Sequence, residues 1–288
     1  MATLRWYFDF VSPYSYLHWQ KLKRLPQFAQ IQTVPIAFGA VLHHLGNLGP
    51  AEIPAKRRFI YRQLQWTAQA EGTPLRFPPG HPFNPLSALR LCLAAGGSVQ
   101  AVDMLFDWIW RDGNAADSAE ALREPAARLG IEDVASAIAD PAVKEQLRRN
   151  TEAAIAAGVF GVPTLAIDDE LFWGNDAHPL MAAVLADPGL LQQPEWQRLA
   201  SLPADLPVVL TGDFNSEPGG DTYKAFTRVL QDTRAQVKAP QGPRLTFHDF
   251  TGKATVQLDW VLVRGFRARS FLTDDRRIHG VLPSAHSP

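Results

Sequence analysis

FDFVSPYSYLH, residues 8–18, carries the clearest structural signal in the amino-acid sequence. It closes an apolar, aromatic run, LRWYFDFV (residues 4–11), that is typical of a buried strand, and it continues with the three-to-four spacing of a helix. We expect Ser12 to cap the helix N-terminus and Pro13 to be the first helical residue, where a missing N–H costs nothing. The stretch predicts a strand that passes into a helix at a Ser-Pro corner.

This corner is of the kind that stabilises a thiolate. Free N–H groups and the helix dipole favour the anion there, and thiol–disulfide enzymes of the thioredoxin type place a Cys-x-x-Cys at such a corner. The four positions here are Ser12, Pro13, Tyr14 and Ser15, and Ser15 is expected to be a hydroxyl on the helix surface. The only cysteine, Cys92, lies in the apolar helical run ALRLCLAAGG and is expected to fill the core. The corner therefore has no thiol of its own.

Composition excludes several classes of protein. The chain has 288 residues, of which 46% are hydrophobic and 20% charged, so it can bury a core and hold two domains. The chain has 28 basic and 29 acidic residues, so its near-zero net charge provides no strong electrostatic attraction to nucleic acid or to an anionic membrane. We find no signal peptide and no apolar stretch of membrane-spanning length, so we expect a cytoplasmic protein.

The order of apolar patterns predicts an α/β domain followed by a different segment. IQTVPIAF (31–38) reads as a second strand, residues from about 40 to 157 read as a helical block, and strand character returns at VPTLAID and ELFWG (162–174) before a last helix. Residues 191–205 are expected to be a linker within a Pro-rich stretch. The predicted domains are 1–190 and 206–288.

The motifs of the first domain resemble one known family. FDFVSPYSYL, Asn47 and Lys56 in GNLGPAEIPAK, GVPT (161–164) and FWGND (172–176) are similar to the 2-hydroxychromene-2-carboxylate isomerases, relatives of kappa-class glutathione transferases within the DsbA superfamily. The match covers about residues 3–187. It implies a thioredoxin-like fold with a large helical insertion, glutathione as the source of the thiol, and a homodimer.

The resemblance assigns roles to individual residues. Ser12 would donate a hydrogen bond to the glutathione thiolate, although by itself it reads as an ordinary N-cap. Val162 and Pro163 would form the cis-proline loop that pairs with the glutathione backbone, whereas most X-Pro bonds are trans. Asn175 and Asp176 would bind the γ-glutamyl end, and here Ala177 follows where the family often has Arg.

The substrate side of the site follows from the same resemblance. Lys56 would pair with the carboxylate of the substrate, and Asn47 would position the substrate. The alternative interpretation of the trio Lys56-Arg57-Arg58 is a solvated helix face. The implied reaction is the glutathione-dependent isomerisation of 2-hydroxychromene-2-carboxylate to trans-o-hydroxybenzylidenepyruvate in the catabolism of aromatic hydrocarbons. Four aromatic residues are candidates for the flat pocket or, as the alternative, for the core: Trp66, Phe83, Trp108 and Trp110.

The second segment resembles another family. TGDFNSEP, QLDWVLV and PSAHS are similar to the last blocks of the endonuclease/exonuclease/phosphatase family, a metal-dependent αβ-sandwich. The matching positions are Asp213, Asn215, Asp259 and His286. Ala285 replaces the closing Asp and the first half of that fold is missing, so we expect a truncated relic, a fusion artefact or a half that awaits a partner chain, and no bound metal.

Three classes of function remain open from the sequence: a glutathione-dependent enzyme, a metal-dependent hydrolase and a binding module. The isomerase is preferred, and a kappa-type glutathione transferase would use the same Ser12. A metal-dependent phosphodiesterase acting through the C-terminal segment is the alternative from another class, and a non-catalytic glutathione-binding module is the third reading.

Overall fold

The computed structural model describes residues 2–200, 207–247 and 253–274, which form two compact units, Met1–Leu191 and Gln192–Pro288. In chain order the elements of the first unit are β1 (Leu4–Phe8), α1 (Pro13–Leu22), η1 (Phe28–Gln30), β2 (Ile31–Pro35), α2 (Phe38–Leu45), η2 (Pro50–Glu52), α3 (Pro54–Ala70), α4 (Leu86–Ala94), α5 (Val99–Phe106), the π-helix η3 (Asp107–Arg111), α6 (Arg123–Arg128), α7 (Val134–Ala139), α8 (Pro141–Ala156), β3 (Thr164–Ile167), β4 (Glu170–Trp173) and α9 (His178–Ala186).

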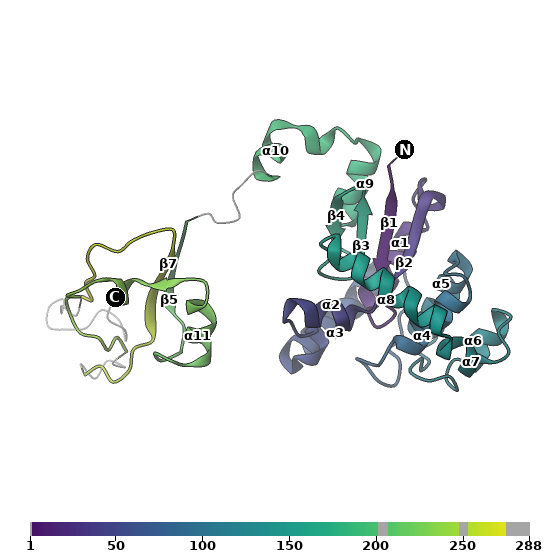
Figure 1. Ribbon diagram of the computed structural model, residues 1–288, viewed down its shortest axis with the longest axis horizontal. Coiled ribbons are helices and arrows are strands. Elements are labelled where there is room, and N and C mark those ends of the chain that lie inside the picture. The colour runs from purple at the N-terminus through teal and green to yellow at the C-terminus, as the bar shows by residue number, and fades with distance from the viewer. Residues whose placement is uncertain (1, 201–206, 248–252, 275–288) are drawn as a thin grey trace. The chain divides into compact units, whose positions relative to one another are not determined.

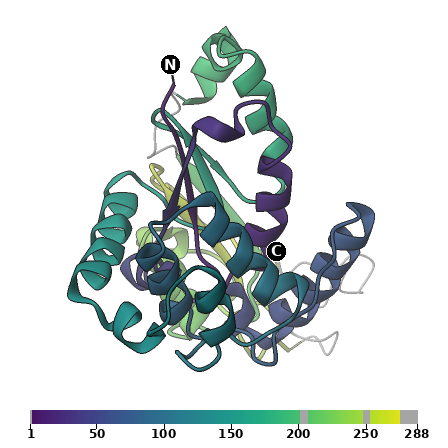
Figure 2. The same cartoon turned by 90° about the vertical axis from the view of Figure 1, so that its right-hand side faces the viewer.

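A four-stranded mixed sheet with the order β2-β1-β3-β4 forms the centre of the first unit (Figure 1). β1 is parallel to β2 and antiparallel to β3, which pairs with β4 through a short turn. All the helices from α2 to α8 lie between β2 and β3 in the chain (Figure 2). This arrangement is the expected thioredoxin-like fold with a large helical insertion.

The two faces of the sheet bury different sets of side chains. Strand alternation sends Trp6 and Phe8 of β1 to one face, where they join a core that includes residues of α1, α5 and α9. Tyr7 points to the other face and packs with Val41 of α2 and Ala154 of α8. Because both faces are covered, β1 is buried at almost every position, as its continuous apolar run predicts.

The second unit has a small core of its own. Its elements are η4 (Leu190–Gln192, at the boundary), α10 (Pro194–Ala200), β5 (Val208–Asp213), α11 (Asp221–Thr227), β6 (Gln231–Asp232), α12 (Thr233–Gln236) and β7 (Asp259–Arg264). The strands form an antiparallel sheet of order β5-β7-β6. Trp260 and Leu262 of β7 pack against Leu230 beneath α11. A further sheet region therefore follows the thioredoxin-like unit.

Candidate active site

Ser12 lies at the corner between β1 and α1, as predicted. It is the N-cap of α1 and Pro13 is the first helical residue. The Ser12 hydroxyl accepts a hydrogen bond from the backbone N–H of Ser15 at 3.2 Å, so its own hydrogen is available to another acceptor. The helix dipole adds positive potential at the same place. A thiolate beside Ser12 would be stabilised by both.

Ser15 does not lie where the sequence pattern placed it. The expectation of a surface hydroxyl is wrong, because Ser15 is fully buried and its Oγ has no hydrogen-bond partner in the described part of the chain. The face of α1 that carries Ser15 packs onto the core with Tyr16 and Trp19. The three-residue spacing alone did not identify the buried face.

The Val162–Pro163 peptide bond is cis, as the resemblance implied. Pro163 precedes β3, and its carbonyl oxygen accepts a hydrogen bond from the N–H of Gly174, just after β4, at 2.9 Å. The backbone N–H and C=O of Val162 make no hydrogen bond within the described residues, and Val162 lines the same cavity as Ser12. An extended peptide in the cavity would find an unused donor and acceptor there.

Asn175 and Asp176 lie between β4 and α9, but neither caps the helix. α9 begins at His178, with Ala177 at its N-cap. Asp176 is exposed. The pKa of Tyr14 is raised first by the burial of Tyr14 and second by the negative charge of Asp176, so this carboxylate lies near the N-terminal end of α1. The side-chain Oδ1 of Asn175 is buried without a partner among the described residues. Neither residue lines the Ser12 cavity, and the carbonyl oxygen of Asn175 accepts from the ammonium of Lys21, in the last turn of α1, at 3.4 Å.

A cavity of about 440 Å³ opens beside Ser12. Asn47 lines it from the loop after α2, and Phe83 lines it from the loop before α4. The sequence analysis assigned no role to four other aromatic residues of its wall: Tyr14, Phe38, His81 and Trp173. The cavity is mainly apolar, and it suits a flat aromatic molecule.

Lys56 and the other aromatic candidates lie outside the cavity lining. Lys56 is exposed on α3, one turn before the cavity residue Ile60, and in the described structure it forms no ion pair. Trp66 is 69% exposed on the same helix. Trp108 is half-buried and donates to the Ala115 carbonyl, and Trp110 is in the core. Of the four aromatic candidates, only Phe83 lines the cavity beside Ser12.

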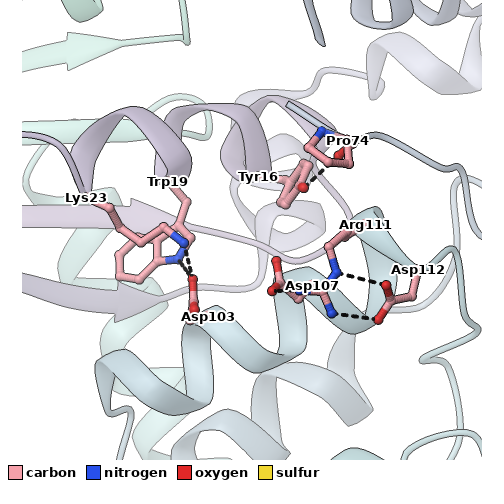
Figure 3. A network of polar contacts seen from close by, with 8 residues as sticks. All are labelled: Tyr16, Trp19, Lys23, Pro74, Asp103, Asp107, Arg111 and Asp112. Atoms are coloured by element: carbon pink, nitrogen blue, oxygen red, sulfur yellow. Dashed lines mark hydrogen bonds and ion pairs between the residues drawn. The ribbon is translucent and has the colours of Figure 1, made fainter. Parts of the chain in front are cut away.

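A polar network on the other side of α1 is separate from this cavity (Figure 3). Asp103 of α5 accepts a hydrogen bond from the indole N–H of Trp19 at 2.8 Å. Arg111 of the π-helix pairs with Asp112 at 2.9 Å, and this carboxylate holds the pKa of Arg111 high. Trp19 and Lys23 thus join α1 to α5, whereas the Arg111–Asp112 pair lies within the π-helix and its C-cap.

Cys92 is excluded as a nucleophile of this site. It is fully buried in α4, as the apolar run predicted, and burial raises the pKa of its thiol to about 12. The thiol is therefore protonated at neutral pH. Any thiolate at Ser12 has to come from a bound molecule.

In the second unit, Asp213 of β5 and Asp259 of β7 stand opposite each other in the antiparallel register. Asn215 follows in a left-handed conformation and donates its N–H to Asp213 Oδ1 at 2.8 Å. His286 and Ala285 lie outside the described residues. Within the described ranges no group of three or more His, Cys, Asp or Glu could hold a metal ion. The assignment of these residues to a nuclease-like site stays a prediction.

Comparison with known proteins identifies the family of the first unit. The DSBA-like thioredoxin domain family matches residues 3–186. The chain belongs to this family. A 2-hydroxychromene-2-carboxylate isomerase of Pseudomonas putida is 34% identical over 182 residues, which cover 59% of this chain and 87% of that protein. Glutathione s-transferase kappa 2 of Caenorhabditis elegans is 29% identical over 212 residues, which cover 65% of this chain and 92% of the transferase.

A solved structure agrees with the sequence relatives. The structure titled 2-hydroxychromene-2-carboxylate isomerase superposes with a TM-score of 0.57 at 28% identity, covering 67% of this chain and 98% of its own. The predicted membership of the first domain in the isomerase and kappa-class branch of the DsbA-like family is thereby confirmed. These relatives support an isomerase or transferase of a glutathione-associated family. Among the described helices, none has the length and apolar character needed to span a membrane.

Proposed function

We propose that the first unit is a glutathione-dependent isomerase that converts 2-hydroxychromene-2-carboxylate to trans-o-hydroxybenzylidenepyruvate. The observation that carries the proposal is the meeting of Ser12 and the cis Val162–Pro163 bond in one aromatic-walled cavity. The names of the relatives support the same reaction. A soluble cytoplasmic homodimer would be consistent with the resemblance.

The residues of the cavity fit glutathione. Val162 has a free backbone donor and acceptor for the cysteinyl residue, and Ser12 has a hydroxyl hydrogen for its sulfur. From outside the cavity lining, Asp176 would receive the γ-glutamyl ammonium, and Asn175 would accept at its Oδ1, which is buried without a partner among the described residues. When bound, glutathione supplies a thiolate that can add to a conjugated double bond and leave again, so that rotation about that bond is allowed.

The chain's own residues would bind and orient the reactants. Ser12 holds the sulfur as an anion by donating a hydrogen bond and by its place at the helix N-terminus. Asn47 donates a positioning hydrogen bond to the substrate, and Phe83 provides a flat wall. Lys56, exposed one turn before Ile60, would reach the substrate carboxylate from outside the lined cavity.

One observation favours a kappa-type glutathione transferase as the second candidate. Among the residues that line the cavity in the described chain, none is Lys or Arg, and Glu52 is acidic. A cavity without a cation in its wall suits an uncharged electrophile better than a carboxylate. The two functions share Ser12 and differ in the substrate.

Parallel assays of the purified chain test both candidates. Isomerisation of 2-hydroxychromene-2-carboxylate that requires glutathione would support the isomerase, and conjugation of 1-chloro-2,4-dinitrobenzene without isomerisation would support the transferase. Ser12→Ala should slow the active reaction by about tenfold to a thousandfold, because one donor to the developing anion is lost.

A matched control separates chemistry from helix capping. Ser98 caps α5 by accepting from the N–H of Ala101 at 3.2 Å and lies outside the cavity lining. Ser98→Ala should lose about 1 kcal/mol of stability, as Ser12→Ala should, but keep full activity. Equal activity in wild type and Ser12→Ala would remove Ser12 from the mechanism.

A further inference from the structure

The peptide groups of Val11, directly before Ser12, are both held by side chains. The N–H of Val11 donates to Asp9 Oδ1 at 3.0 Å. The carbonyl oxygen of Val11 lies 2.8 Å from His81 Nε2. Because a carbonyl oxygen accepts, Nε2 of His81 carries the proton and donates it. Residues from two distant parts of the chain thus fix one backbone unit beside the candidate catalytic serine.

His81 is in turn fixed by Tyr61 of α3. The Tyr61 hydroxyl lies 2.6 Å from His81 Nδ1 and 2.9 Å from the His81 carbonyl oxygen, and with the proton on Nε2 both of these atoms are acceptors for its one hydrogen. The ring of Trp110 packs edge-on against His81 with the centroids 5.3 Å apart. Burial lowers the pKa of His81, so the neutral ring that donates from Nε2 and accepts at Nδ1 persists at neutral pH.

Asp9 is a buried carboxylate without a cation. Its side chain is fully buried, and its second oxygen accepts from the N–H of Phe38, the first residue of α2, at 2.9 Å. In the described chain it forms no ion pair, so its charge is opposed only by two N–H groups. Burying a charge without a cation beside it is unfavourable, and an uncharged residue at this position would not have that cost. A purely structural role therefore does not explain the aspartate.

We propose that Asp9 and His81, with Tyr61 behind His81, are positioning residues that clamp the Val11 peptide and thereby aim the Ser12 hydroxyl at the bound thiolate. The proposal rests on the proposed function of Ser12. The polar atoms of Asp9 and His81 are engaged with protein groups, so both residues position Ser12 through Val11, although the ring of His81 also forms part of the cavity wall. Rotation of the released peptide would displace Ser12, and misplacement by about 1 Å can cost about a hundredfold in rate.

Variants of His81 test the clamp. His81→Phe keeps a ring but loses both hydrogen bonds, whereas His81→Gln keeps a side-chain N–H that can reach Val11. We expect His81→Phe to lower kcat by about tenfold to a hundredfold with the KM for glutathione unchanged within about threefold, and His81→Gln to recover part of the loss. His44→Phe, a change at an exposed histidine outside the cavity lining, is the matched control and should retain kcat.

Hydrogen exchange gives a readout that needs no glutathione. In His81→Phe the amides of Val11 and Ser12 should exchange faster than in the wild type, while the amides of the strand β3 keep their protection. The clamp is overturned if kcat and the exchange of these two amides match the wild type, or if His81→Gln is as impaired as His81→Phe while both are folded. A wild-type chain that neither binds glutathione nor turns over substrate would refute the proposed function. Exchange at Val11 and Ser12 would then decide the clamp alone, with faster exchange in His81→Phe supporting it.

Discussion

Replacing Asp9 with asparagine should make the protein more stable at alkaline pH and less active. The carboxyl group is fully buried, and burial raises its pKa from the ordinary 3.8 to about 7, against the opposite effect of the N–H groups of Val11 and Phe38. Asparagine has the shape of the protonated acid and cannot ionise, but its amide nitrogen cannot accept a hydrogen bond, so either the Val11 or the Phe38 N–H loses its acceptor. The variant therefore lacks the pH dependence of Asp9 and carries a pH-independent cost of about 1 to 3 kcal/mol.

The sign and size of the effect follow from linkage. Between about pH 4 and pH 7 the unfolded chain releases the Asp9 proton while the native protein keeps it, so the wild type loses stability as pH rises through this window. The difference between 3.8 and about 7, at 1.36 kcal/mol per pH unit, corresponds to about 4 kcal/mol. Asp9→Asn should be less stable than the wild type near the lower end by the cost of the lost acceptor, about 1 to 3 kcal/mol. Across the window the variant should gain up to about 4 kcal/mol relative to the wild type, so that it is the more stable protein above the window.

Urea unfolding of both proteins at several pH values between about 4 and 8 measures this difference. Asp169→Asn, at an exposed aspartate in the turn between β3 and β4, is the control and should change stability by less than about 0.5 kcal/mol at each pH. A stability difference between wild type and Asp9→Asn that stays constant across the range would refute the reasoning, because it would mean that burial does not oppose ionisation of Asp9. If Asp9 holds Val11 in place as proposed, Asp9→Asn should have a lower kcat than the wild type even where it is more stable.

The remaining predictions concern the substrate and the second unit. Lys56→Met keeps the aliphatic stem but loses the charge, so it should weaken binding of a carboxylate substrate by about 1.5 to 3 kcal/mol and glutathione binding less. Lys144→Met, at an exposed lysine, is the control and should leave the kinetic constants unchanged. Unchanged kinetic constants in Lys56→Met as well would mean that Lys56-Arg57-Arg58 is only a solvated helix face. Deletion of residues 206–288 should leave glutathione-dependent turnover intact, since the cavity is lined by residues from Val11 to Trp173. The full chain should show no Mg²⁺-dependent phosphodiesterase activity, and cleavage abolished by both a chelator and Asp213→Ala would contradict this.

Local chemistry determined the predictions that the structure confirmed. An N-cap serine followed by proline depends on neighbouring residues, so the Ser12 corner could be placed from residues 8–18 alone. The cis form of Val162–Pro163 was expected from the GVPT motif and its family resemblance, since the intrinsic preference of an X-Pro bond is for trans. The burial of Cys92 followed from the apolar spacing of its helix.

Only the tertiary structure decided which residues meet at the site. Periodicity shows that a helix has an apolar face but not what covers that face, so it could not tell the cavity wall at Phe83 from the core at Trp110 or the surface at Trp66. The same limit hid the burial of Ser15.

Asp9 was visible in the sequence as a charge inside an apolar strand, yet its partner at Phe38 and the contact of His81 with Val11 depend on packing between segments 29 and 70 residues apart. Such contacts form because the insertion folds back over the end of β1, and no local pattern in either segment encodes that approach.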